Sequence, residues 1–258
     1  MPSINKILKK ITLKELCIVI ISLFVIFYIL SFLDILSFNS TWIYVLVIVY
    51  FLFKFRNSSD LKKDIVEVFS KDSIKTIVIV VILNIFLSYG LLYLADFIIK
   101  MLPWLNFLIN CSLSSIYLNN SLNLTFGFIT IIIISPISEE LIFRGVMLNR
   151  LRLFVPTKFA ILMTSLLFAS LHSFGSITSA FIFAMCMATL YLKTNNILIP
   201  IFAHFLNNLL AESIVFIDGQ NILFTNSLAI YSFSILAAIS FVIILILISN
   251  EWNNFNID

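Results

Sequence analysis

The feature that most constrains the fold of this chain is an uncharged stretch at residues 159–192, which lies between Lys158 and Lys193. As one α-helix its 34 residues would extend about 51 Å at about 1.5 Å per residue, too long for one crossing of a bilayer. The turn-forming segment SFGS at residues 173–176 is therefore predicted to divide it into two short membrane helices.

The composition supports a membrane protein. Hydrophobic residues make up 61% of the 258-residue chain and charged residues 11%, and the mean hydropathy is +1.12. Soluble domains are about 45–50% apolar and about 25% charged, so the soluble class is excluded. The expected surroundings are the lipid bilayer, with no nucleic-acid partner. We expect a multi-pass protein of a cell membrane, the plasma membrane of a bacterium.

Charge-free runs predict the other spans, so we expect an all-α polytopic membrane protein with a bundle of about eight transmembrane helices. A segment at residues 60–75 alternates apolar and charged residues at helical spacing, which predicts an amphipathic helix on the membrane surface. The predicted spans are 16–33, 35–53, 76–95, a fourth from about 124 through a pair of glutamates, the two halves of 159–192, 196–217 and 222–249.

Basic residues predict the orientation. If both termini are cytoplasmic, every lysine and arginine except Lys100 falls on the cytoplasmic side, as the positive-inside rule requires. Counting residues 101–120 as a further span would break this pattern, so we interpret them as an outer loop. The expected divisions are residues 1–123 with the first three spans, 124–217 with the core helices, and 218–258 with the last span and tail.

The fourth predicted span carries charges in the sequence SPISEELIFRG, residues 135–145. Glu140 and Arg144 are four residues apart, so on a helix they are neighbours and predict an ion pair. Glu139 lies about 100° around the helix from Glu140 and cannot share that pair fully. One glutamate is therefore anchored, and Glu139 is left as a candidate general base.

The chain has only two histidines, and both lie in hydrophobic sequence. Ionisable groups at membrane depth are costly and usually functional, so His172 and His204 are candidate site residues. His204 and Asn208 share a helix face, and their hydrogen-bond donors would suit an oxyanion hole. Phe168 and His172 also share a face, which predicts an aromatic ring packed beside the imidazole.

These residues resemble the three motifs of the CAAX protease and bacteriocin-processing (CPBP, or Abi) family of intramembrane glutamic endopeptidases. The resemblance covers about residues 124–212 and implies an eight-helix bundle that hydrolyses a peptide bond of a membrane-associated peptide or protein, with no cofactor and no metal. It implies that Glu139 and His172 activate a water, that His204 and Asn208 stabilise the oxyanion, and that the rest of the motifs support them. The motifs are Glu139-Glu140-x-x-x-Arg144, Phe168-x-x-x-His172 and His204-x-x-x-Asn208.

Two other interpretations use the same residues. His172, His204 and Glu139 could form a two-histidine, one-carboxylate zinc site of a membrane metalloprotease. A non-catalytic bacteriocin-immunity protein could instead bind a peptide without cleaving it. Cys17, Cys111 and Cys186 have no metal-binding spacing. The substrate stays open between a prenylated C-terminal tail, a leader peptide and a bacteriocin.

Overall fold

The computed structural model describes residues 3–33, 40–59, 61–102, 126–172 and 176–255, and within these ranges every regular element is a helix. The all-α class is therefore confirmed for the described chain. The elements are α1 (Ile4–Leu8), α2 (Leu13–Phe32), α3 (Ser40–Phe55), α4 (Leu61–Val68), α5 (Lys71–Met101), α7 (Phe126–Ile129), η2 (Thr130–Ile134), α8 (Ser135–Glu140), η3 (Leu141–Leu148), α9 (Asn149–Leu151), α10 (Thr157–Ser170), α11 (Ile177–Thr194), α12 (Leu198–Ile217), α13 (Ile222–Thr225) and α14 (Ser227–Asn254).

Five of the described helices, α2, α5, α11, α12 and α14, are long and apolar enough to cross a membrane. Two further apolar helices, Thr41–Phe55 and Thr157–Ser170, are shorter. The break predicted within residues 159–192 is confirmed, because α10 ends at Ser170 and α11 begins at Ile177. The total of eight crossings and the cytoplasmic placement of both termini stay predictions. The outer loop expected at residues 101–120 lies mostly outside the described residues.

Among the boundaries that differ from the sequence prediction, two are explained by capping side chains. The amphipathic helix ends at Val68, because the Ser70 side chain accepts a hydrogen bond from the Ser73 amide and starts α5 there. The last predicted span is divided at Asn226, whose side chain accepts from the amides of Leu228 and Ala229 and begins α14. In both cases a polar side chain that caps a helix outweighed the hydropathy pattern.

The fourth span is a composite helix. Residues 126–151 run through α7, η2, α8, η3 and α9, and the segments η2 and η3 on either side of the two glutamates are π-helical. π-Helical turns are rare and occur frequently at functional sites. The π-helical segments were not predicted, because the wider turn of a π-helix produces no recognisable pattern in a mostly apolar sequence.

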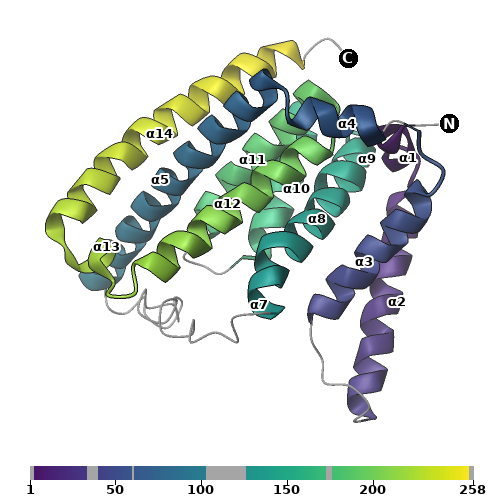
Figure 1. Cartoon of the computed structure of the whole chain (residues 1–258), viewed down its shortest axis with the longest axis horizontal. Coiled ribbons are helices and arrows are strands. Elements are labelled where there is room, and N and C mark those ends of the chain that lie inside the picture. The colour runs from purple at the N-terminus through teal and green to yellow at the C-terminus, as the bar shows by residue number, and fades with distance from the viewer. Residues whose placement is uncertain (1–2, 34–39, 60, 103–125, 173–175, 256–258) are drawn as a thin grey trace.

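The helices are arranged as a bundle with two outer pairs (Figure 1). At one side α5 packs along α14, at the other α2 packs along α3, and α7 to α12 lie between them. Helices α1, α4 and α9 lie at the end of the bundle where both chain termini are drawn. Large apolar side chains such as Tyr28 and Phe32 of α2 and Leu228 of α14 are about three-quarters exposed, which is expected of a surface that faces lipid.

The contact between α5 and α14 depends on a glycine. A Cβ built at Gly90 would lie 2.2 Å from the Cβ of Ala237, whereas a Cβ at Gly127 would meet nothing within 4 Å. Small residues let membrane helices approach closely, which is the main source of their packing energy. Phe233 of α14 contacts Phe86 and Tyr89 beside this point.

We expect Gly90→Ala to destabilise the protein by about 1–3 kcal/mol, because the added methyl group must force α5 and α14 apart. Gly127→Ala is the matched control and should be neutral or slightly stabilising, since alanine is otherwise preferred to glycine in helices. The measurement is thermal unfolding of both variants in the same detergent. Equal melting temperatures for the two variants would show that the α5–α14 contact is looser than the structure indicates.

Candidate active site

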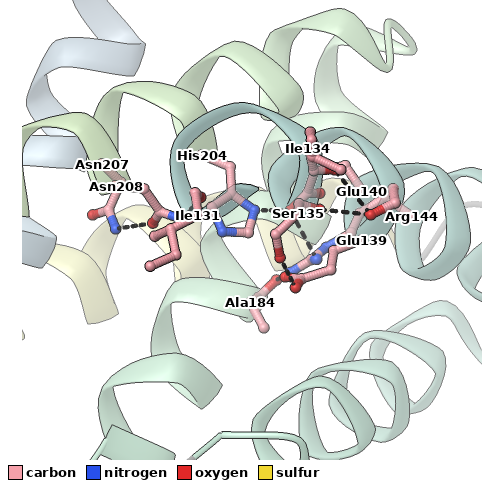
Figure 2. A network of polar contacts seen from close by, with 11 residues as sticks. Ile131, Ile134, Ser135, Glu139, Glu140, Arg144, Ala184, His204, Asn207 and Asn208 are labelled. Atoms are coloured by element: carbon pink, nitrogen blue, oxygen red, sulfur yellow. Dashed lines mark hydrogen bonds and ion pairs between the residues drawn. The ribbon is translucent and has the colours of Figure 1, made fainter. Parts of the chain in front are cut away.

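The centre of the site is the Glu140 carboxylate, which is completely buried. Its Oε1 atom accepts a hydrogen bond from Nη1 of Arg144 at 2.9 Å and another from Nδ1 of His204 at 2.9 Å (Figure 2). The ion pair that the i,i+4 spacing predicts is therefore present. The contact between Glu140 and His204 joins α8 to α12 and was not predicted.

The Arg144 guanidinium is held from two directions. Its Nη2 donates to the backbone carbonyl of Ala184 in α11 at 3.1 Å, while its Nη1 holds Glu140. The arginine is 2% exposed and the glutamate 0%, so both charges of the pair are buried away from bulk solvent. A buried pair of this kind needs several hydrogen bonds to offset the cost of desolvating both charges. The Oε2 atom of Glu140 has no protein partner among the described residues, and a water is the usual partner of such an atom.

Glu139 faces a different direction from Glu140. Its carboxylate accepts a hydrogen bond from the Ser135 hydroxyl, one helical turn earlier (Figure 2). Glu139 is only partly buried. Tyr44 of α3 also lies close to Ser135 and Glu139. One carboxylate of the pair is thus fixed in the bundle, and the other is accessible.

Phe168 connects the three motifs. Its ring lies 4.7 Å from the His172 ring and 6.0 Å from the His204 ring, between ring centres, and the Arg144 guanidinium lies 4.6 Å from its centre. The expected packing of Phe168 beside His172 is therefore confirmed. Because Phe168 is 1% exposed, it forms a fixed wall against which both histidines and the arginine are placed.

His172 is partly buried and lies just after the end of α10. Its Nδ1 is 3.0 Å from the backbone carbonyl oxygen of Phe168. A carbonyl can only accept, so Nδ1 carries the proton and Nε2 of the neutral ring keeps its lone pair. In the described part of the chain no hydrogen bond or ion pair joins His172 to Glu139, so a group between them would have to connect the two.

Asn208 belongs to a chain of side-chain amides. Nδ2 of Asn84 in α5 donates to Oδ1 of Asn207 at 2.8 Å, and Nδ2 of Asn207 donates to Oδ1 of Asn208 at 3.3 Å. Nδ2 of Asn208 then donates to the carbonyl of Ile131 in η2 at 2.9 Å. Donor and acceptor alternate along the chain, so each bond strengthens the next. Asn84 is 3% exposed and fixes the direction of the Asn208 amide.

The structure thus brings Glu140, Arg144, His204, Phe168 and His172 into one connected network and directs Asn208 toward η2. Sequence analysis missed Ser135, Tyr44 and the amides of Asn84 and Asn207. Ser135 could have been found from its i,i+4 spacing to Glu139. Within the described residues, no three His, Cys, Asp or Glu side chains gather closely enough to hold a metal ion, so the zinc interpretation gains no geometric support.

The comparisons with known proteins agree with the motifs. Residues 121–210 match the family model described as type II CAAX prenyl endopeptidase Rce1-like, which confirms the family resemblance stated from the sequence. The match contains all three motifs. No curated protein and no solved structure matches the chain.

Proposed function

We propose, taking residues 121–210 as an Rce1-like domain, that this protein is an intramembrane glutamic endopeptidase of a bacterial plasma membrane. Its substrate would be a membrane-associated peptide or protein. The supporting observation is the division between the two adjacent carboxylates. Glu140 is buried and bound by Arg144 and His204, whereas Glu139 is only partly buried and accepts a hydrogen bond from the Ser135 hydroxyl.

In this proposal Glu139 and His172 hold the attacking water between them. The lone pair of His172 Nε2 accepts one hydrogen bond from the water, and the Glu139 carboxylate removes the proton as the oxygen attacks the peptide carbonyl. Glu139 then returns that proton to the amine nitrogen as the C–N bond breaks. Water is the nucleophile, so neither a serine nor a cysteine nucleophile is required.

The developing oxyanion would be stabilised from α12. Asn208 donates one N–H to Ile131 and has a second N–H on the same nitrogen for the oxyanion. His204 already donates from Nδ1 to Glu140, so it can donate to the oxyanion only from a protonated Nε2. The role of His204 therefore requires the imidazolium form, and Glu140 is the anion that would accompany it.

The experiment that tests the proposal compares the membrane peptides of a producing strain that carries the wild-type protein with those of a strain that carries Glu139→Gln. We expect specific precursor peptides to accumulate in the variant and their cleaved forms to be lost. The purified wild type should cleave such a precursor equally well with o-phenanthroline present. Identical peptide profiles would contradict the peptidase assignment, and inhibition by the chelator would contradict the metal-free mechanism.

We expect Asn208→Ala to lower kcat about 10²–10³-fold with little change in KM, because the lost hydrogen bond forms only with the oxyanion. Asn84→Leu should lower kcat by a smaller factor, since Asn208 keeps its amide but loses its orientation. Steady-state kinetics on one identified substrate measures both variants. An increase in KM at unchanged kcat would mean that Asn208 binds the substrate rather than the transition state.

A further inference from the structure

Glu212 takes no part in the proposed mechanism. It lies in the last two turns of α12, at the end of the bundle opposite to α4 (Figure 1). The side chain is partly buried, and no hydrogen bond or ion pair joins it to any residue that the structure describes. Asp96 and Asp218, two other carboxylates of this end, both have partners. Asp96 pairs with Lys100 at 2.6 Å, and Asp218 accepts from two backbone amides of α13 at 2.7 and 3.1 Å.

The sequence supplies almost no positive charge near Glu212. From residue 76 to residue 143 the chain has one lysine, Lys100, and no arginine, and after Lys193 it has neither. Lys100 already pairs with Asp96, and Lys193 lies in the last turn of α11, at the opposite end of the bundle. A carboxylate that is partly withdrawn from water is costly without a partner. The positive charge that would balance Glu212 is therefore expected to come from another molecule.

Glu212 continues the face of α12 that carries the proposed oxyanion donors. His204, Asn208 and Glu212 follow one another at steps of four residues, which place each side chain about 40° around the helix and about 6 Å along it from the one before. His204 is buried, whereas Asn208 and Glu212 are partly buried, so access increases along this face. The Asn208 amide contacts the Ile131 carbonyl of η2, the segment that leads to the two glutamates. A peptide held at Asn208 and extended along α12 would pass Glu212.

We propose that Glu212 binds a basic side chain of the substrate, a lysine or an arginine about two residues from the peptide bond that is cleaved. The inference rests on the proposed peptidase function and narrows its substrate to membrane-associated peptides with a positive charge close to the cleavage site. An extended peptide advances about 3.3 Å per residue, so the rise of about 6 Å from Asn208 to Glu212 corresponds to about two residues. An ammonium or guanidinium group would form a charge-assisted hydrogen bond with the carboxylate and offset its desolvation.

The test uses the whole purified protein in dodecylmaltoside micelles and short, internally quenched peptides of leucine and alanine. In one set a single lysine occupies each position in turn. In the matched set norleucine, which has a similar length and no charge, replaces the lysine. Steady-state kinetics measures cleavage, and mass spectrometry of the products locates the cleaved bond. Isothermal titration calorimetry with Glu139→Gln measures binding of the same peptides without cleavage.

We expect the wild type to cleave peptides with lysine about two residues from the bond with a kcat/KM about tenfold above that for norleucine, on the scale of one hydrogen bond to a charged group. The difference should lie mainly in KM, because the contact forms with the bound substrate. Glu212→Gln should remove the preference, and Glu212→Lys should reverse it in favour of glutamate at that position. Asp96→Asn is the matched control, because it removes the same charge from the same end, and it should keep the preference.

Equal cleavage of the two peptide sets by the wild type, or a lysine preference that survives in Glu212→Gln, would overturn the inference and leave the peptidase function standing. If no peptide of either set is cleaved, binding to Glu139→Gln decides. Tighter binding of the lysine peptides that is lost when Glu212→Gln is added would support the cation site, and the comparison of membrane peptides tests the peptidase function separately. Equal binding of the two sets would overturn the inference and would leave Glu212 as a hydrated side chain.

Discussion

Glu139→Gln is expected to abolish peptide-bond cleavage while leaving the melting temperature in detergent close to that of the wild type. The glutamine is nearly the same size and can still accept the Ser135 hydrogen bond, but it cannot accept a proton from water at neutral pH. Glu139 is only partly buried and forms no ion pair with a described residue, so the folded state loses little. The measurement is single-turnover cleavage of an identified precursor together with thermal unfolding.

Ser135→Ala is the control for this experiment, because it removes the hydrogen bond to Glu139 and leaves the carboxylate in place. It should reduce the rate by a modest factor through a less well-oriented base. Substantial cleavage by Glu139→Gln would show that another group removes the proton. A marked fall in its melting temperature would show that Glu139 stabilises the bundle, against the division of roles proposed for the two glutamates.

Much of the architecture could be predicted because hydropathy and helical spacing can be read from short segments of the sequence. The limits of α2 and α12 and the break between α10 and α11 follow from where charged, turn-forming and apolar residues stand. The pairing of Glu140 with Arg144 and the contact of Phe168 with His172 also follow, since each joins residues four apart on one helix. These contacts depend on the periodicity of one helix, which the sequence carries directly.

The parts that could not be predicted join different helices. The bond from His204 to Glu140 depends on how α12 crosses α8, and the chain from Asn84 to Asn208 depends on how α5 packs against α12. Tyr44 reaches Ser135 from α3, which lies outside the family motifs. No spacing in the sequence encodes these crossings. The π-helical segments η2 and η3, which flank the two glutamates, also leave no recognisable pattern in the sequence.

Glu140→Gln should destabilise the protein by about 3–5 kcal/mol, the usual cost of removing one partner from a buried ion pair. Arg144 would keep its charge in a site where it is 2% exposed, and His204 would lose the carboxylate that its Nδ1 contacts. Activity should fall as well, because both side chains lose their positions. Thermal or denaturant unfolding in a single detergent measures the loss, and cleavage is measured well below the lowered melting temperature.

Asp96→Asn provides the matched control, because Asp96 and Lys100 form an ion pair with the same i,i+4 spacing that is largely exposed. Exposed pairs contribute about 0–1 kcal/mol, so this change of acid to amide should barely alter stability. Adding Arg144→Met to Glu140→Gln should recover part of the lost stability, since no uncompensated charge then remains in the bundle. Equal small losses for Glu140→Gln and Asp96→Asn would contradict a dry, charged centre. Recovery of stability without recovery of cleavage would show that the pair positions His204 for chemistry, and that the fold itself does not require it.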